Sequence, residues 1–346
     1  MKRFIFALMI IVVSIIIFVL LKPNKSVVEN DYKITELPKV DPTDPTDPVP
    51  VIAGTFKHSI LSDGLTRTYI LHVPPQDNAK SIPLVVLLHG GGGNGVRIID
   101  QTKFDTKADI NEFILVAPDG IENNWNDGRG STFRRESTDT VANVDDVKFI
   151  ADLIKEIQKT YPIDKDRIYI TGFSNGAMMA QRMICDLPNI FAAVGETSGP
   201  MLTQTANTCI GASAVIGIHG TNDPFFPISG DGDGIPIFPR ILARNAEQQV
   251  LTMSELTELW LTKNRCQTTA NITKSEPSVN DGTEVNHYVY AGCNKGYEVE
   301  YYIVNKMGHS WPPYLGESKL SGLTSANINA TDVIWDFFSK HTLTKK

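Results

Sequence analysis

From residue 52 onward, short apolar runs alternate with stretches of helical periodicity. Residues 84–88 and 214–218 are apolar throughout, as expected for strands of a mostly parallel sheet that helices cover on both faces. The predicted strands are residues 66–73, 82–90, 113–120, 167–173, 192–199, 214–220 and 298–304. The fold class is therefore α/β, in which ligands bind beyond the carboxyl ends of the strands.

Helical patterns lie between the predicted strands. Residues 145–160 predict a helix because apolar side chains recur there at spacings of three and four. These side chains are Val147, Ile150, Ile154 and Ile157. Residues 175–185 and 327–340 predict two more helices, and one domain over residues 52–346 accommodates all of these elements.

The N-terminus has a different pattern. Residues 4–21 contain no charge and follow a basic start, which predicts an export signal over residues 1–21. It is either a signal anchor or a cleaved signal peptide, and the lack of a small-x-small motif before Lys22 favours the anchor. Positive charge ahead of the run places the rest of the chain outside the cytoplasm, secreted or held at a membrane. Residues 22–51, with repeated Asp-Pro-Thr units, predict a stiff linker.

Composition and charge narrow the classes of partner. The 346 residues are 42% hydrophobic, which is enough for a sizeable core. The net charge is −7, and no block of Lys or Arg offers a surface to a nucleic-acid backbone. Nucleic acid is therefore not an expected partner.

Four cysteines lie in the exported part of the chain, where thiols tend to oxidise. No CxxC or Cys/His spacing indicates a zinc site. Pairing of Cys185 with Cys209 and of Cys266 with Cys293 is favoured, because loops of this length close at moderate entropic cost. Four unpaired thiols are the alternative.

Ser174 is the candidate nucleophile. It lies between Gly172 and Gly176 in a GxSxG motif, after a predicted strand and before a predicted helix. A sharp strand-to-helix turn needs glycine at both flanks and leaves the serine hydroxyl exposed at the start of the helix. In hydrolases of this architecture an acid and then a histidine follow the serine along the chain.

His309 is the candidate base. It follows the strand predicted over residues 298–304, in a glycine-containing turn before the last helix. Of the other histidines after Ser174, His219 lies at the end of a buried strand, His287 in an alternating stretch, and His341 in a polar tail. A structural role for a loop histidine is the alternative.

Asp223 is the candidate acid, because it lies in the loop after the strand at 214–220. It is expected to orient the imidazole of His309 and to stabilise its charged form. Asp231 and Asp233 are rivals in what reads as a surface loop, which lacks the terminal carboxylate of a calcium loop.

The oxyanion that forms on attack needs two N–H donors. The amide of Asn175 is one candidate, and the glycine-rich run after the strand at 82–90 supplies the other. Gly91 is favoured, with Gly90 or Gly92 as alternatives. The run is neither a phosphate-binding P-loop, since no Gly-Lys-Ser/Thr follows, nor a dinucleotide fingerprint. The chemistry requires no metal ion or organic cofactor.

These residues resemble the α/β-hydrolase esterases grouped with polyhydroxybutyrate depolymerases and feruloyl esterases. The matching segments are "PLVVLLHGGGGNG", "VAPDG", "NNWNDGR", "VDDVKFI", "YPIDKDRIYITGFSNGAMM", "IHGTNDPFFP" and "GHSWP", in family order over residues 54–340. The resemblance implies that Ser174, Asp223 and His309 form the triad of a secreted enzyme acting on carboxylic esters. It also supports the pairing of Cys266 with Cys293.

Aromatic side chains on the motif loops are candidates for the substrate pocket, although such residues are as often part of the core. They are Trp125, Phe225, Phe226 and Trp311. Residues 231–262 predict either a lid or an ordinary helical insertion. Besides an esterase acting on a polymer, a polysaccharide ester or a small ester, an acyltransferase and a catalytically silent binding domain are the alternatives.

Overall fold

The computed structural model describes most of the chain from residue 52 to residue 343. The described residues are 34, 52–75, 80–129, 143–229, 249–313 and 319–343. The export signal predicted over residues 1–21 lies outside them, as does the linker over residues 22–51 apart from Ile34. Within the described part of the chain, no helix is both long enough and apolar enough to cross a membrane.

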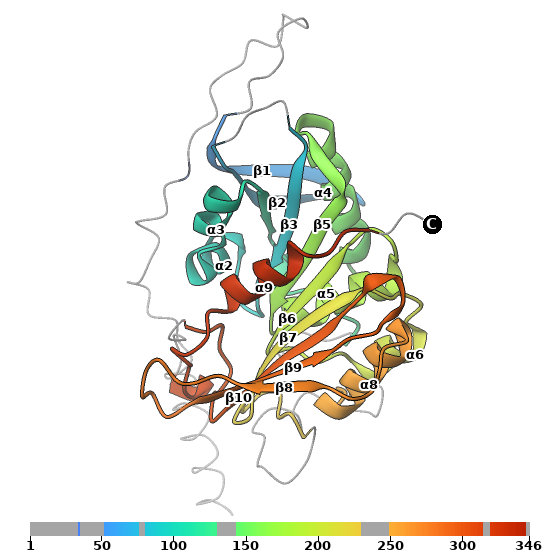
Figure 1. Cartoon of the computed structure of the whole chain (residues 1–346). Helices are drawn as coiled ribbons and strands as arrows, with labels where there is room; N and C mark the ends of the chain where they lie inside the picture. The colour runs from blue at the N-terminus through green and yellow to red at the C-terminus, as the bar shows by residue number, and fades with distance from the viewer. Residues whose placement is uncertain are drawn as a thin grey trace, which may run out of the picture. The chain divides into compact units, whose positions relative to one another are not determined.

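One sheet of ten strands forms the centre of the domain (Figure 1). The strands are β1 (Gly54–Ser62), β2 (Leu65–Val73), β3 (Ile82–Leu88), β4 (Ile114–Pro118), β5 (Ile163–Phe173), β6 (Ala193–Thr197), β7 (Ala214–Gly220), β8 (Asn271–Lys274), β9 (Glu284–Tyr290) and β10 (Val299–Asn305). Their order is β1-β2-β4-β3-β5-β6-β7-β10-β9-β8. The six strands from β4 to β10 in this order are parallel and the pairs at both edges are antiparallel, which confirms the predicted mostly parallel sheet.

Helices cover both faces of this sheet, as predicted (Figure 1). The α-helices are α2 (Gly95–Thr102), α3 (Phe104–Asn111), α4 (Asp146–Thr160), α5 (Asn175–Asp186), α6 (Thr203–Thr208), α8 (Met253–Asn264) and α9 (Ala330–Phe338). Helix α9 packs on one face, where a Cβ on Gly195 of β6 would meet Ile334 and Phe338. Helix α5 packs on the other, against Gly172 of β5.

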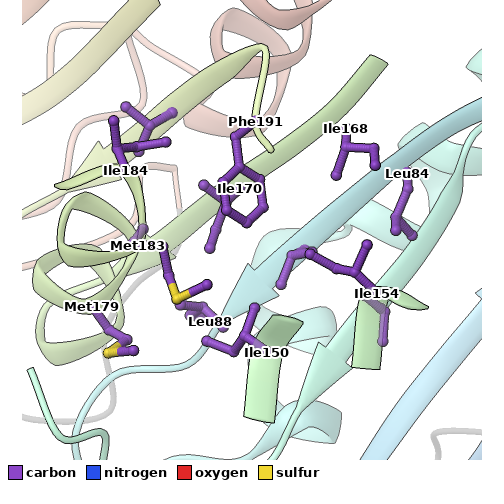
Figure 2. Packing of buried hydrophobic residues seen from close by; sticks show 14 of the residues in the cluster. Leu84, Leu88, Ile150, Ile154, Ile168, Ile170, Met179, Met183, Ile184 and Phe191 are labelled. Carbon is purple, nitrogen blue, oxygen red and sulfur yellow. The ribbon is translucent and has the colours of Figure 1, made fainter. Parts of the chain in front are cut away.

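The largest apolar core lies between the sheet and helices α4 and α5 (Figure 2). Alternate residues of β3 and β5 face these helices, and their side chains are almost completely buried. The side chains in contact are Leu84, Leu88, Ile168 and Ile170 of the sheet, Ile150 and Ile154 of α4, and Met179, Met183 and Ile184 of α5. This core fixes the direction in which α5 leaves β5.

Every strand and helix predicted from the sequence is present, with ends that differ by a few residues. The stretch around His287 forms β9, as its alternating pattern indicated. The strand predictions omitted β1 and β8, and the helix predictions omitted α2, α3 and α6. Residues 231–248 of the predicted lid or insertion lie outside the described residues, and α8 accounts for most of the remainder.

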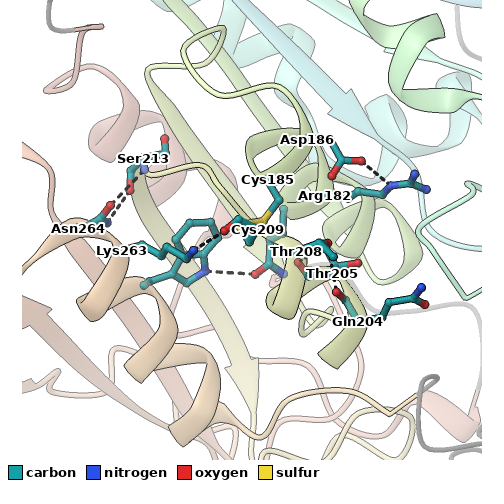
Figure 3. Close-up of a disulfide and its surroundings, with 12 residues drawn as sticks. Arg182, Cys185, Asp186, Gln204, Thr205, Thr208, Cys209, Ser213, Lys263 and Asn264 are labelled. Carbon is teal, nitrogen blue, oxygen red and sulfur yellow. Dashed lines mark hydrogen bonds and ion pairs between the residues drawn. A yellow bond between two sulfur atoms is a disulfide. The ribbon is translucent and has the colours of Figure 1, made fainter.

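Two disulfides join the expected cysteines, Cys185 with Cys209 and Cys266 with Cys293. The first ties the end of α5 to the segment after α6 (Figure 3). Lys263 of α8 donates a hydrogen bond to the carbonyl of Cys209 in the same region. The Cys185–Cys209 disulfide closes a loop with a sequence separation of 24 residues. It therefore stabilises the fold by about 3 kcal/mol by lowering the entropy of the unfolded chain.

Replacing Ile170 by Ala tests the importance of the core beneath α5. The side chain is completely buried, so we expect the free energy of unfolding to fall by about 2–5 kcal/mol. Urea denaturation measures the change. Ile110→Ala is the matched control, because that side chain on α3 is 72% exposed. A loss of similar size in both variants would contradict the assigned core.

Candidate active site

The turn between β5 and α5 holds Ser174 in a strained conformation. Its backbone has φ 54° and ψ −119°, and its amide donates to the carbonyl of Thr197 on β6 at 2.9 Å. A Cβ on Gly172 would lie 2.4 Å from the backbone of Gly176, and one on Gly176 would lie 2.4 Å from the carbonyl oxygen of Leu88. Both glycines are therefore required for the close approach of β5, α5 and β3.

Asp223 and His309 form a buried pair. Nδ1 of His309 lies 2.7 Å from Oδ2 of Asp223, and the two side chains are 9% and 2% exposed. The other carboxylate oxygen accepts hydrogen bonds from the amides of Phe225 and Phe226 at 2.8 and 2.9 Å. Because an ionised carboxylate only accepts, Nδ1 carries the proton and Nε2 can act as a base. Asp231 and Asp233 lie outside the described residues.

Three phenylalanine rings surround the imidazole of His309. The ring centroids of Phe173 and Phe225 lie 4.8 and 4.7 Å from that of His309, and Phe226 lies at 5.8 Å. Phe173 precedes Ser174, so these contacts bring the turn at Ser174 beside His309. Among the described residues, no hydrogen bond joins the Ser174 hydroxyl to His309. Such bonds often tighten only when the substrate is bound.

The glycine-rich run after β3 lies against this turn. A Cβ on Gly90 would lie 3.4 Å from the Cβ of Ser174, which places the two backbones close together. The amide of Gly93 donates to the carbonyl of Gly90 within the loop, and that of Gly92 donates to the carbonyl of Asn123 in the segment after β4. Their use there leaves Gly90 and Gly91 as the better candidates for an N–H donor to an oxyanion.

His89 holds the glycine-rich run in place. Its Nε2 accepts from the amide of Gly120 at 2.9 Å, its Nδ1 donates to the carbonyl of Gly90 at 2.8 Å, and its own carbonyl accepts from the indole of Trp125 at 2.8 Å. Burial lowers the pKa of His89 to about 4, so the ring is neutral at ordinary pH. In the sequence, His89 is visible only as the first residue of a motif.

The side chain of Asn175 links α5 to the loop that carries Trp125. Its Oδ1 accepts from the amide of Trp125 at 2.8 Å, and its Nδ2 donates to Asp127 at 2.6 Å. Asp127 is paired with Arg129 at 2.6 Å. The sequence predicted only a role for the amide of Asn175. Trp125 is 2% exposed, and its indole donates to the carbonyl of His89. These contacts do not support the predicted role of Trp125 in substrate binding, which stays a prediction.

A cavity of about 220 Å³ adjoins His309 and the glycine-rich run. Trp311, predicted as a substrate contact, lines this cavity, and Phe225 lies beside the imidazole. Phe173, Ile98 and the polar side chains of Arg97, Gln101 and Ser321 complete much of the wall. The space is suited to one small group bound next to the base.

Two of the other histidines considered from the sequence, His219 and His287, have carboxylate partners elsewhere. Nε2 of His219 lies 2.5 Å from the carboxylate of Glu196, and Nε2 of His287 lies 2.8 Å from that of Glu300. Of the histidines after Ser174, His309 is paired with the predicted acid. In the described ranges, no group of three or more His, Cys, Asp or Glu residues is arranged to hold a metal ion.

Comparisons with known proteins identify the family of the chain. The family model for the esterase PHB depolymerases matches residues 67–264. The chain belongs to this esterase family. It is accordingly a carboxylic ester hydrolase.

Individual relatives cover most of this esterase. NocK of Nocardia uniformis subsp. tsuyamanensis, named as an esterase, is 26% identical over 292 residues, which are 82% of this chain and 83% of NocK. A probable feruloyl esterase C of Aspergillus clavatus is 30% identical over 211 residues, 57% of this chain and 70% of that protein. The acetyl xylan esterase of Aspergillus awamori has a TM-score of 0.53 and 14% identity, covering 82% of this chain and 98% of that chain, and shows the α/β-hydrolase fold.

Two carboxylates in the motifs of this esterase join segments next to Ser174, one at the glycine-rich run and one at the loop that carries Asn126. Asp119, in "VAPDG", accepts from the amide of Gly95 at 2.7 Å. Asp146, in "VDDVKFI", accepts from the amide of Asn126 at 2.7 Å and pairs with Arg67 at the same distance. The motifs were visible in the sequence, but their positioning role depends on contacts between distant segments.

The neutral, buried state of His89 predicts a pH dependence of stability. Burial lowers its pKa from 6.5 to about 4, so between these values the unfolded chain binds a proton that the folded chain does not. Stability therefore falls as the pH falls through this window. We expect the urea midpoint to decrease more steeply between about pH 7 and about pH 4.5 in the wild type than in His89→Gln. The same pH dependence of the urea midpoint in the two proteins would contradict the role of His89.

Proposed function

We propose that this esterase hydrolyses its substrate through an acyl-enzyme formed on Ser174. The observation that carries the proposal is the buried pair of His309 and Asp223, beside a serine held in a strained turn. A hydroxyl needs such a base to become a nucleophile at neutral pH. The burial of the pair and its dedicated hydrogen bonds support a catalytic role rather than a surface contact.

In the proposed reaction, Nε2 of His309 takes the proton of the Ser174 hydroxyl as its oxygen attacks the ester carbonyl. Asp223 holds the imidazole through Nδ1 and stabilises its charged form. The tetrahedral intermediate collapses, and His309 gives the proton to the departing alcohol. Water, deprotonated by the same base, then attacks the acyl-enzyme, and the carboxylic acid leaves as Ser174 regains its proton.

The oxyanion of the intermediate is proposed to bind two backbone amides. The amide of Asn175 lies at the start of α5, and a donor from Gly91 or Gly90 comes from the run after β3. The hydrogen bonds of His89 and of the Asn175 side chain would hold both donors in position before the negative charge develops on the oxyanion. Preorganised donors of this kind are commonly worth 10²–10³-fold in kcat.

We propose an acyl ester on a polysaccharide as the substrate. The names of the relatives, a feruloyl esterase and an acetyl xylan esterase, support this class, and the cavity of about 220 Å³ suits a single acyl group. Export of the chain from the cytoplasm belongs to the same proposal, because polysaccharides lie outside the cell. Its two disulfides are typical of an oxidising compartment.

Substitution of Ser174 by Ala tests the nucleophile. We expect kcat for p-nitrophenyl acetate to fall by about 10⁴-fold or more, because no other hydroxyl occupies the turn. Labelling of the wild type by a fluorophosphonate, followed by mass spectrometry, should place the adduct on Ser174 and be absent from the variant. Ser198→Ala, at a neighbouring strand end, is the control and should keep its label. Full turnover by Ser174→Ala would refute the acyl-enzyme.

A comparison of substrates tests the ester class. Release of acetate from acetylated xylan and of ferulate from feruloylated arabinoxylan should exceed, in kcat/KM, the release of hydroxybutyrate from a polyhydroxybutyrate film. The physical reason is that a small cavity accepts one acyl group at a time. Chromatography of the released acids provides the measurement. Faster hydrolysis of the polyester film would contradict the polysaccharide assignment while leaving the serine chemistry intact.

A further inference from the structure

A second cavity, of about 580 Å³, lies between α8 and strands β9 and β10. None of its lining residues lines the cavity beside His309. Tyr288 of β9 is in register with Tyr301 of β10, so both side chains lie on the face that α8 covers. Tyr290 and Ile303 extend the same face by one alternate position each, and Thr257 and Leu261 contribute from α8.

Tyr301 lines this cavity, and the Thr257 hydroxyl is the side-chain group that interacts with its own hydroxyl. Its side chain is 2% exposed, and its hydroxyl makes no hydrogen bond of normal geometry to any described residue. Burial and the nearby Glu196 carboxyl raise the pKa of the hydroxyl well above its usual range, against a smaller lowering by the Thr257 hydroxyl, so it remains a donor. Buried hydroxyls in proteins usually have a partner. A hydroxyl on a cavity wall with no hydrogen bond of normal geometry can bond better to a group that enters the cavity.

The rest of the lining combines aromatic rings with neutral hydroxyls. Tyr288 and Tyr290 offer ring faces, and Thr262 and Thr268 offer hydroxyls near the rim. The hydroxyl of Thr257 donates to the carbonyl of Met253 at 2.7 Å, and its oxygen faces the hydroxyl of Tyr301. The charged side chains are one carboxylate, Glu258, and one guanidinium, Arg265, so the lining has no net charge.

From these features we propose that the cavity binds a neutral sugar unit of a polysaccharide. A pyranose ring has an apolar C–H face that packs on an aromatic ring and equatorial hydroxyls that exchange hydrogen bonds with Tyr and Thr. The inference rests on the proposed function, because it assigns a saccharide subsite to an enzyme acting on a polysaccharide ester. It concerns a region away from the catalytic residues.

The position of the second cavity relative to His309 suits one polysaccharide that occupies both this cavity and the one beside His309. His309 is six residues beyond Ile303, so the near edge of the cavity lies within about 20 Å of the base. The amide of Met253, which lines the cavity, donates to the carbonyl of Ile228 in the loop that follows Asp223. A bound saccharide of several units would be long enough for an ester on the same polysaccharide to reach Ser174.

Isothermal titration with unsubstituted xylohexaose, which contains no ester, tests the proposal on the whole protein. We expect saturable binding by the wild type and about fivefold weaker binding by Tyr301→Phe, which removes only the hydroxyl. Tyr288→Ala should weaken binding about tenfold through loss of the ring face. Tyr302→Phe, one residue along β10 and on the opposite face, is the matched control and should bind like the wild type.

The binding of xylohexaose and the hydrolysis of p-nitrophenyl acetate test the saccharide site and the acyl-enzyme separately. Binding is measured without turnover, and hydrolysis of p-nitrophenyl acetate by Tyr301→Phe should equal that of the wild type. The melting temperature of this variant should be nearly unchanged, because the buried hydroxyl makes no hydrogen bond of normal geometry in the folded protein. Absence of saturable binding to the wild type, or equal affinity in Tyr301→Phe, would overturn the saccharide site and leave the proposed acyl-enzyme untouched.

Discussion

The close approach of α5 to the sheet is the constraint on which the site depends. Only glycine fits at positions 172 and 176, because a Cβ on Gly172 or Gly176 would lie 2.4 Å from neighbouring backbone atoms. This approach forces Ser174 to φ 54°, a region that costs a residue with a side chain about 1–3 kcal/mol. The core between α4, α5 and the sheet supplies the stability that offsets this strain.

A second layer of buried polar contacts turns this local strain into a defined site. His89, Asn175, Asp119 and Asp146 each bond to backbone amides or carbonyls of a different loop. Buried groups of this kind are unfavourable unless they are satisfied, so the loops can adopt few other arrangements. The donors proposed around Ser174 are therefore positioned by the folded state itself, which is what electrostatic catalysis requires.

The sequence was informative where the signal is local or topological. Ser174, Asp223 and His309 each follow a strand of the parallel centre, so their order along the chain was enough to identify them as candidates. The sequence was silent about contacts between distant segments, such as the bond from the amide of Trp125 to the Asn175 side chain, 50 residues away. The sequence does not distinguish an aromatic residue that lines a pocket from one that, like Trp125, supports a neighbouring loop through a hydrogen bond.

The omitted elements have local causes. Helices α2 and α3 have eight residues each and are separated by Lys103, whose φ of 55° interrupts the helical path. Two such short helices do not produce a long periodic pattern. Strand β8 is exposed at all four positions, so it has no buried face to create an alternation. Its place in the sheet comes from pairing with β9.

The two cavities affect catalysis in different ways. Contacts made around Ser174 and His309 change as the carbonyl becomes tetrahedral, so they can lower the barrier and raise kcat. Contacts made by a sugar ring near Tyr301 are the same in the ground state and the transition state, because that part of the substrate does not react. Such uniform binding lowers KM without raising kcat. If both proposals hold, the strained turn serves the reaction, while affinity for the polymer comes from a part of the sheet that carries none of the proposed catalytic residues.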